Sequence, residues 1–258
     1  MKGTSYFDGE GKMNLFGNNQ EDFPFAMFGS SHIAALAVLL VLLIVLYVFR
    51  SVLKEKKMKP LEIGLAVSLA AVELLYHVWL IVNNNWEVRH ALPLELCNIS
   101  FILTVLLLLT GSRLVYEILL FIGLMGASQA LLTPVLSIDF PHFRFFHFFY
   151  THTWIIAVPL YYTWVKGYRP TIYSVLKTVV FLNILLPLVL FVNSYTGGNY
   201  MFLDHKPSSG SLLDLLGPYP WYILSLEGIA AGMGLVLWLI FREKTGAEGK
   251  RAEAGSFD

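Results

Sequence analysis

The chain has 258 residues, of which 56% are hydrophobic, 15% aromatic and only 14% charged, and its formal net charge is zero. Soluble domains usually carry about a quarter charged residues, so this composition indicates a membrane protein. The zero net charge gives no reason to expect a nucleic acid or an acidic partner. The single cysteine, Cys97, excludes an internal disulfide and any metal site that needs two cysteines.

Seven apolar segments are predicted to cross the membrane. The polar stretch before them, residues 1–29, lacks the basic region and cleavage pattern of a signal peptide. Each segment, with its flanks, suits a hydrocarbon core of about 30 Å. They lie at residues 33–53, 61–82, 92–110, 114–132, 144–165, 171–193 and 221–241. Residues 194–220 are too rich in Gly, Ser and Pro to cross, although Leu212–Leu216 is predicted as a short interfacial helix.

The predicted fold is all-α: a polytopic membrane protein with one bundle of seven transmembrane helices at residues 30–241. Lys and Arg gather in cytoplasmic loops, and this pattern puts 13 of the 18 basic residues on one side. The amino-terminal tail, residues 1–29, is therefore predicted outside. The charged tail, residues 242–258, is predicted to be cytoplasmic and disordered. We expect an integral protein of a bacterial plasma membrane.

Polar side chains within the predicted spans are functional candidates, because an ionisable group in hydrocarbon is costly. Asn183 is the clearest one in the inner half. Glu73 and His77 are four residues apart and share a helix face, where they can form an ion pair or hold a proton. The outer group comprises His32, Glu73, His77, Glu95, Cys97, Asn98, Gln129, His147, Thr151, His152 and Glu227.

Cys97 and His152 are the strongest pair in this group. At 1.5 Å per residue, Cys97 lies roughly 6 to 9 Å and His152 about 12 Å inside their spans, so the two can meet. A thiol reacts as thiolate, and an imidazole can take its proton and return it to a leaving group. Glu73, Glu95 or His77 would orient that imidazole or hold a proton. The competing interpretation is that Cys97 is a small packing residue.

The other polar residues have simpler interpretations. His142, Arg144 and His147 fit an interfacial belt, and His32, His90 and His205 are end or loop residues. Thr151 is a supporting residue. Glu227 adjoins Gly228, Ala231, Gly232 and Gly234, a face suited to close helix packing, so it is predicted to bond a neighbouring helix. A weaker alternative joins Glu73, His77 and His152 in a metal site; otherwise no metal or cofactor is expected.

Three motifs carry a resemblance to a known family. They are Phe28-Gly-Ser-Ser-His32, then Leu92-Pro-Leu-Glu-Leu-Cys-Asn-Ile-Ser100, and Thr151-His152 followed by Pro159-Leu160. With them the sequence resembles, over residues 25 to 241, the transmembrane protein 164 / YwaF-type family of seven-span integral membrane proteins. The resemblance implies an acyltransferase acting on phospholipids, with Cys97 as the acyl-accepting nucleophile and His152 as its base.

The predicted function is therefore a phospholipid acyltransferase or transacylase that forms a cysteine thioester and passes the acyl chain to a lysolipid. Asn98, Gln129 or backbone amides would stabilise the oxyanion. The partners are membrane phospholipid, lysophospholipid and the bilayer, and no nucleic acid. Two alternatives stay open: a lipid hydrolase with the same Cys/His pair, and a non-enzymatic lipid-binding or transport protein with a polar outer cavity.

Overall fold

The computed structural model describes residues 14–18, 23–206 and 212–243, and these form helices without a β-strand. The predicted all-α class is confirmed. Most of the predicted carboxyl-terminal tail, residues 244–258, and residues 1–13 lie outside the described ranges. The helices are α1 Ser30–Val48, α2 Arg50–Lys54, α3 Lys59–Val82, α4 Leu96–Thr110, α5 Arg113–Leu132, α6 Phe143–Trp164, α7 Ile172–Thr196 and α8 Trp221–Phe241, with 3₁₀ helices η1 Tyr200–Phe202 and η2 Leu212–Leu216.

The structure has a helix at each of the seven predicted spans, but not every one of these helices is long and apolar enough to cross a membrane. Five of them, α1, α3, α5, α7 and α8, are long and apolar enough by length and composition. Helix α4 is apolar but has only 15 residues. Helix α6 is not among the five, and it contains Arg144, His147 and His152. The chain is thus an integral membrane protein by its helices, while the count of seven crossings stays a prediction.

The helix ends follow from local backbone chemistry. Helix α4 begins at Leu96, four residues later than predicted, because Pro93 and its neighbours form a turn in which the Leu94 N–H donates to the Leu92 carbonyl. Gly111 ends α4 with a left-handed φ of 65°, a conformation that glycine adopts at little cost. The sharp turn at Gly111 returns the chain as α5, so α4 and α5 are antiparallel neighbours.

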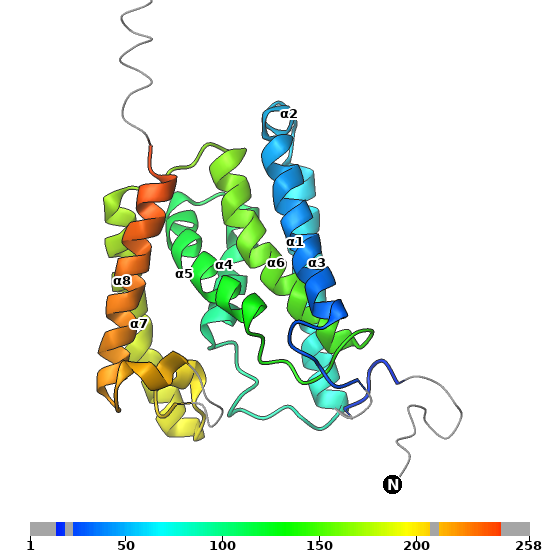
Figure 1. Ribbon diagram of the computed structural model, residues 1–258, viewed down its shortest axis with the longest axis vertical. Coiled ribbons are helices and arrows are strands. Elements are labelled where there is room, and N and C mark those ends of the chain that lie inside the picture. Colours follow the sequence, from blue (N-terminus) through cyan, green and yellow to red (C-terminus); the bar gives the residue numbers. More distant parts are fainter. Residues whose placement is uncertain (1–13, 19–22, 207–211, 244–258) are drawn as a thin grey trace, which may run out of the picture.

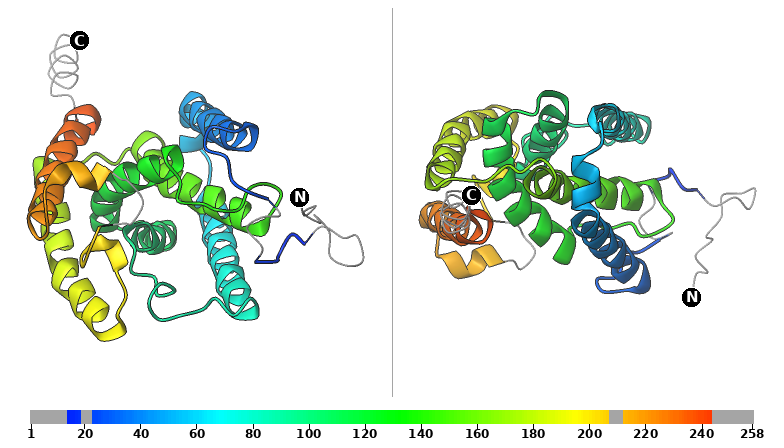
Figure 2. Two further views of the ribbon diagram at one scale, coloured as in Figure 1. Left: turned by 60° about the horizontal axis from the view of Figure 1, so that its bottom comes forward. Right: turned by 90° about the horizontal axis from the view of Figure 1, so that it is seen from above.

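Helix α5 is the centre of the bundle and packs against α4, α6, α7 and α8. Helices α7 and α8 lie at one side of the molecule and α1 and α3 at the other, with α4, α5 and α6 between them (Figures 1 and 2). Helix α6 separates α1 from α3 and contacts both. The largest buried apolar cluster lies mainly between α4, α5 and α6.

Two carboxylates are buried near the end of the bundle that carries most of the Lys and Arg residues. The sequence analysis missed both and found Asn183 as the clearest polar group in that half. Glu62 is 5% exposed; its carboxylate lies 2.7 Å from Lys166 Nζ and accepts a hydrogen bond of 2.6 Å from the Tyr161 hydroxyl. Glu117 is 2% exposed and lies 2.5 Å from Lys177 Nζ. Both acids lie near the start of their helices, and the sequence analysis named neither of them.

Close packing of α5 on α6 depends on Gly123. A Cβ at Gly123 would lie 3.2 Å from both Cγ2 and the backbone oxygen of Ile155. Because that oxygen belongs to a packed helix, Gly123→Ala is expected to destabilise the protein by about 1–3 kcal/mol, measured by unfolding in detergent. The control is Gly228→Ala on α8, where a Cβ meets nothing within 4 Å. It should leave stability unchanged or raise it, since alanine is the better helix former. Equal stability of the two variants would contradict this packing.

The amino-terminal segment packs across the end of α3 and α6. The indole N–H of Trp79 donates to the Phe16 carbonyl at 2.9 Å, and His142 Nε2 donates to the Gly17 carbonyl at the same distance. Further along, Phe25 N–H donates to Ser137 of the α5–α6 loop. The described parts of the predicted tail therefore form a fixed border around this end of the bundle.

Candidate functional site

Cys97 is the second residue of α4 and faces α5. A Cβ built at Gly126 would lie 4.0 Å from the Cys97 Sγ and 3.9 Å from Leu96 Cδ2. The thiol is free and half-buried, and within the described part of the chain it makes no hydrogen bond. Because Gly126 has no side chain, a space of about one methyl group remains beside the sulfur, and a larger residue would overfill it.

His152 of α6 lies at about the same level in the bundle as Cys97. Helices α4 and α6 run in the same direction, and the Tyr162 hydroxyl donates to the Leu107 carbonyl at 2.8 Å. Cys97 precedes Leu107 by ten residues and His152 precedes Tyr162 by ten. Both therefore lie about 15 Å from that contact along their helices.

A second contact supports the same level. Gly123 of α5 touches Ile155 of α6, and the two helices are antiparallel. Three residues further along α5 is Gly126, and three residues back along α6 is His152. Cys97, Gly126 and His152 therefore lie at about one level along α4, α5 and α6, and the thiol and the imidazole form no hydrogen bond in the described structure.

The imidazole of His152 is held by its own helix. Its Nδ1 lies 2.8 Å from the Phe148 carbonyl, and its ring stacks on the Phe148 ring with centroids 4.2 Å apart. A carbonyl only accepts, so Nδ1 carries the hydrogen in the neutral ring and Nε2 carries the lone pair. Nε2 has no partner among the described residues. His152 is consequently oriented by its own helix, with its accepting nitrogen unoccupied in the described structure.

The predicted Glu73 and His77 pair is real but long, and a third residue completes it. Glu73 Oε1 lies 3.8 Å from His77 Nε2, whereas Glu73 Oε2 lies 2.9 Å from Nε2 of His147 on α6. Trp86 Nε1 donates to His77 Nδ1 at 3.3 Å, and Arg144 Nη1 donates to His147 Nδ1 at 3.0 Å. These five residues form one hydrogen-bonded and ionic chain that links α3 to α6.

Two members of this chain were expected at the interface and are not simple interfacial anchors. His147 is only 7% exposed. Arg144 lies with its guanidinium carbon 4.3 Å above the Tyr76 ring. Their spacing of three residues puts both on one face of α6, and this signal was present in the sequence. What the sequence lacked was the partner, because only the fold brings Glu73 to that face.

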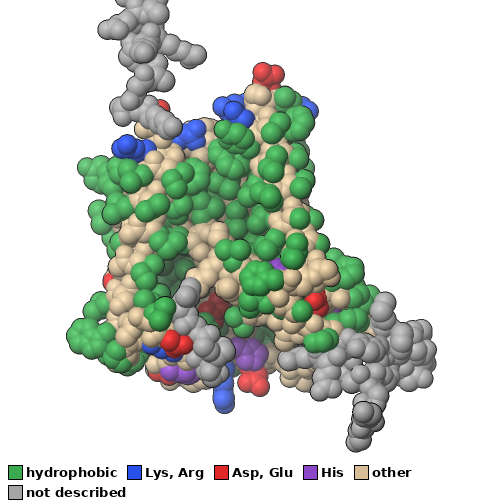
Figure 3. All heavy atoms as spheres, viewed as in Figure 1, with side chains coloured by type: hydrophobic (Ala, Val, Ile, Leu, Met, Phe, Trp, Pro, Cys, Tyr) green, Lys and Arg blue, Asp and Glu red, His purple; other side chains and the backbone are tan. Residues whose placement is uncertain are grey.

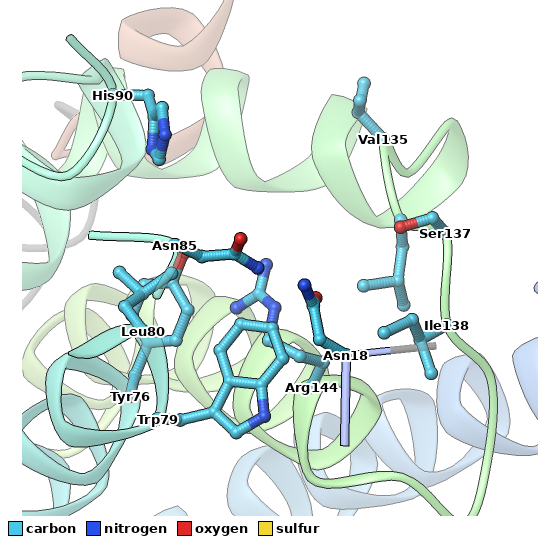
Figure 4. Close-up of a pocket in the computed structure, with 11 residues that line it drawn as sticks. Asn18, Tyr76, Trp79, Leu80, Asn85, His90, Val135, Ser137, Ile138 and Arg144 are labelled. Atoms are coloured by element: carbon cyan, nitrogen blue, oxygen red, sulfur yellow. The ribbon is translucent and has the colours of Figure 1, made fainter. Parts of the chain in front are cut away.

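Arg144 also lines a pocket of 290 Å³ at the end of the bundle where α3 and α6 meet the connecting loops. Figure 4 shows its guanidinium between the side chains of Asn85 and Asn18, beside Tyr76 and Trp79. No carboxylate of the described residues forms an ion pair with Arg144. The pocket is not lined by Cys97 or His152.

The loop after α7 is tied to the start of α4. Glu95 Oε2 accepts a hydrogen bond from Met201 N–H at 3.0 Å. The Tyr200 hydroxyl donates to the Val88 carbonyl at 2.7 Å and accepts from Leu92 N–H at 2.9 Å. Burial raises the pKa of the Tyr200 hydroxyl above its ordinary value, which keeps it a donor. Glu95 therefore fixes this loop at the start of α4.

The remaining candidates are scattered. Thr151 is buried and its hydroxyl donates to the His147 carbonyl at 2.8 Å. Asn98 is half-buried and Gln129 exposed, and neither side chain has a hydrogen bond in the described residues. Glu227 was predicted to bond a neighbouring helix, but it has no hydrogen bond or ion pair within these ranges. Gly228 beside it faces open space.

His32 was dismissed from the sequence and is in fact fully buried. Its Nδ1 accepts from Phe28 N–H at 3.0 Å and its Nε2 donates to the Leu131 carbonyl at 2.8 Å, so it ties α1 to the end of α5. The metal alternative finds no support either, since His147 and not His152 joins Glu73. Among the described residues no group of three His, Cys, Asp or Glu is placed to hold a metal ion.

Apolar helices with polar groups buried between them define a polytopic helical membrane protein. The TMEM164 family model matches residues 27–241, most of the chain, so the protein belongs to the TMEM164 family. No curated protein and no solved structure matches it.

Proposed function

We propose that the protein is a membrane-embedded phospholipid acyltransferase in which Cys97 carries the acyl group and His152 is the base. The observation that carries the proposal is the common level of the thiol, the unoccupied Nε2 of His152 and the gap at Gly126. A packing cysteine needs neither an oriented base nor space beside its sulfur. Acyl transfer needs both.

The proposed topology has seven crossings, with the amino terminus outside the plasma membrane of a bacterial cell. Most basic side chains visible in Figure 3 lie at the end that carries α2 and the carboxyl end of α8, with hydrophobic side chains over the band next to it. Cytoplasmic loops of membrane proteins are enriched in Lys and Arg, so we assign that end to the cytoplasm. Cys97 and His152 then face the outer leaflet, near the glycerol esters of its lipids.

The chemistry proceeds in two balanced steps. His152 Nε2 takes the Cys97 proton, and the thiolate attacks a phospholipid ester carbonyl. The carbon–oxygen bond breaks and the imidazolium gives its proton to the departing lysolipid oxygen. In the second step a lysolipid hydroxyl gives its proton to His152 and attacks the thioester, the carbon–sulfur bond breaks, and the thiolate regains the proton.

The oxyanion of each step would form beside the start of α4. The first amide groups of a helix have no intrahelical acceptor, and Cys97 and Asn98 are both in the first turn. The Asn98 amide has no hydrogen bond in the described structure and adds a free donor. Gln129 is the second side-chain candidate for this role. These donors favour developing negative charge at the carbonyl oxygen.

The test is to incubate the purified protein with a diacyl phospholipid that carries a labelled acyl chain. A label on Cys97 that hydroxylamine removes at neutral pH is expected. Transfer to added lysophospholipid distinguishes an acyltransferase from a hydrolase, which releases free fatty acid. Absence of any covalent label, with lipid still bound, would instead favour a non-enzymatic lipid-binding or transport protein.

The gap beside the thiol gives a separate prediction. Gly126→Leu fills the space next to Cys97 and is expected to slow acylation by about tenfold to a hundredfold, because the ester carbonyl can no longer approach at the required distance. Gly126→Ala is the matched control, since its Cβ makes only an ordinary contact at 4.0 Å. Initial rates of labelling measure both. Full activity of Gly126→Leu would show that the ester approaches from elsewhere.

A further inference from the structure

The pocket at Arg144 is lined by polar side chains and by two aromatic rings. Four polar side chains line it besides Arg144: Asn18, Asn85, His90 and Ser137. None of these four makes a side-chain hydrogen bond in the described structure, so their polar groups are available to a ligand. Tyr76 and Trp79 supply the aromatic surface, and Leu80, Val135, Leu136 and Ile138 the aliphatic one.

The Arg144 guanidinium has more N–H donors than the neighbouring described residues have acceptors for it. One of its guanidinium nitrogens donates to His147 Nδ1 at 3.0 Å, and its flat face lies 4.3 Å from the Tyr76 ring centre and 5.8 Å from that of Trp79. A guanidinium has five N–H donors, and the others have no acceptor within the described residues. These N–H groups belong to a half-buried cation that has no carboxylate within ion-pair distance among the described residues, so an anion would satisfy them.

The position of Arg144 is fixed by a hydrogen bond to His147, which does not line the pocket. His147 accepts from Arg144 through Nδ1, so its Nε2 carries the hydrogen that it donates to Glu73 at 2.9 Å. Because His147 accepts through Nδ1, the ring is neutral, and Glu73 and Arg144 are opposite charges joined through His147 without a direct ion pair. The carboxylate thus fixes the tautomer of His147, and this ring in turn directs the guanidinium while leaving its remaining N–H groups free.

We propose that this pocket binds a phosphate group, with Arg144 as its principal ligand and the amides of Asn18 and Asn85 as further donors. A planar guanidinium pairs with two phosphate oxygens at once, and Figure 4 shows both amides beside it. The volume of 290 Å³ is at the lower limit for ligand pockets and suits a head group, not a whole lipid. Aliphatic residues on one wall suit the glycerol and first acyl carbons.

Phosphate binding is independent of acyl transfer, but the two sites are placed to serve one substrate. The guanidinium reaches the level of His147, and His152 is five residues further along α6, about 7.5 Å. The phosphate of a glycerophospholipid is separated from its ester carbonyls by a similar short span. Only this link to the ester rests on the proposed function; binding itself does not.

The experiment measures binding to the full-length protein in an uncharged detergent by titration calorimetry. The probes are sn-glycerol 3-phosphate and dihexanoyl phosphatidylglycerol. Arg144→Gln is expected to weaken binding by at least about tenfold, since charge-assisted hydrogen bonds are lost. Arg89→Gln, which removes an exposed arginine that does not line the pocket, should leave the affinity unchanged.

The binding of the two probes, compared between the wild type and the variants, decides the proposal. Binding of both probes identifies a site for phosphate from any source, and binding of the lipid alone identifies the head group; both support the site if Arg144→Gln weakens them. Asn85→Leu, in a loop, guards against misfolding of the arginine variant and should weaken binding about threefold to tenfold. Failure of both probes to bind, or equal affinity of the wild type and Asn85→Leu or a folded Arg144→Gln, overturns the proposal. Cys97→Ala should bind as the wild type, so loss of acyl transfer alone leaves this site standing.

Discussion

Cys97→Ala is expected to lower the rate of acyl transfer by about a thousandfold or more and to abolish the hydroxylamine-sensitive label. The covalent route needs the sulfur to hold the acyl chain between the two steps, and no second cysteine exists to replace it. The measurement is single-turnover labelling with a phospholipid, followed by transfer to lysolipid. Because alanine removes only one atom and is a good helix former, the variant should keep its helical content and its melting temperature within a few degrees.

Cys97→Ser sharpens the same experiment. The hydroxyl is a poorer nucleophile than the thiol, so labelling should be slow, and any label formed is an oxygen ester that resists neutral hydroxylamine. This change in chemical sensitivity assigns the bond to residue 97 itself. Wild-type transfer rates in Cys97→Ala would leave the thiol a packing residue and remove the thioester mechanism.

The helices could be predicted from the sequence because each is an apolar run that ends at a residue with a physical reason to end it. Gly111 and Gly197 close α4 and α7 in left-handed conformations. The boundary at residue 92 was wrong by four residues, since a proline near an apolar run can begin a helix or precede it. Local chemistry does not decide between these without knowledge of the turn that α3 and α4 must make.

The candidate site depends on a different kind of information. Depth along a helix can be counted from sequence, and for this reason Cys97 and His152 were predicted at a similar depth. Which faces meet is a property of the packed bundle. Glu73 was paired with His77, four residues away, whereas its shorter contact is to His147, 74 positions along the chain. The opening at Gly126 and the pocket at Arg144 likewise exist only once helices and loops are assembled.

His152→Asn is the second prediction with a large effect, and it separates chemistry from packing. The asparagine amide occupies the place of Nδ1 and can still donate to the Phe148 carbonyl, while Nε2 is removed. The rate of both acylation and transfer should fall by about a hundredfold to ten-thousandfold, the range of general base catalysis. A purely structural role predicts near-normal rates, because the hydrogen bond to the helix is kept.

Chemical rescue distinguishes a lost base from a disturbed fold. His152→Ala leaves a space where the ring was, and added imidazole should restore part of the activity of that variant, with a saturable dependence on its concentration. The same imidazole should not restore Cys97→Ala, whose missing group forms a covalent bond. Rescue confined to His152→Ala would assign the proton transfer to Nε2, since Nδ1 is already committed to Phe148. Normal rates in His152→Asn would mean that another group takes the thiol proton. The nearest polar side chains on the start of α4 are then Asn98, which cannot act as a base, and Glu95, which Met201 already occupies on one oxygen.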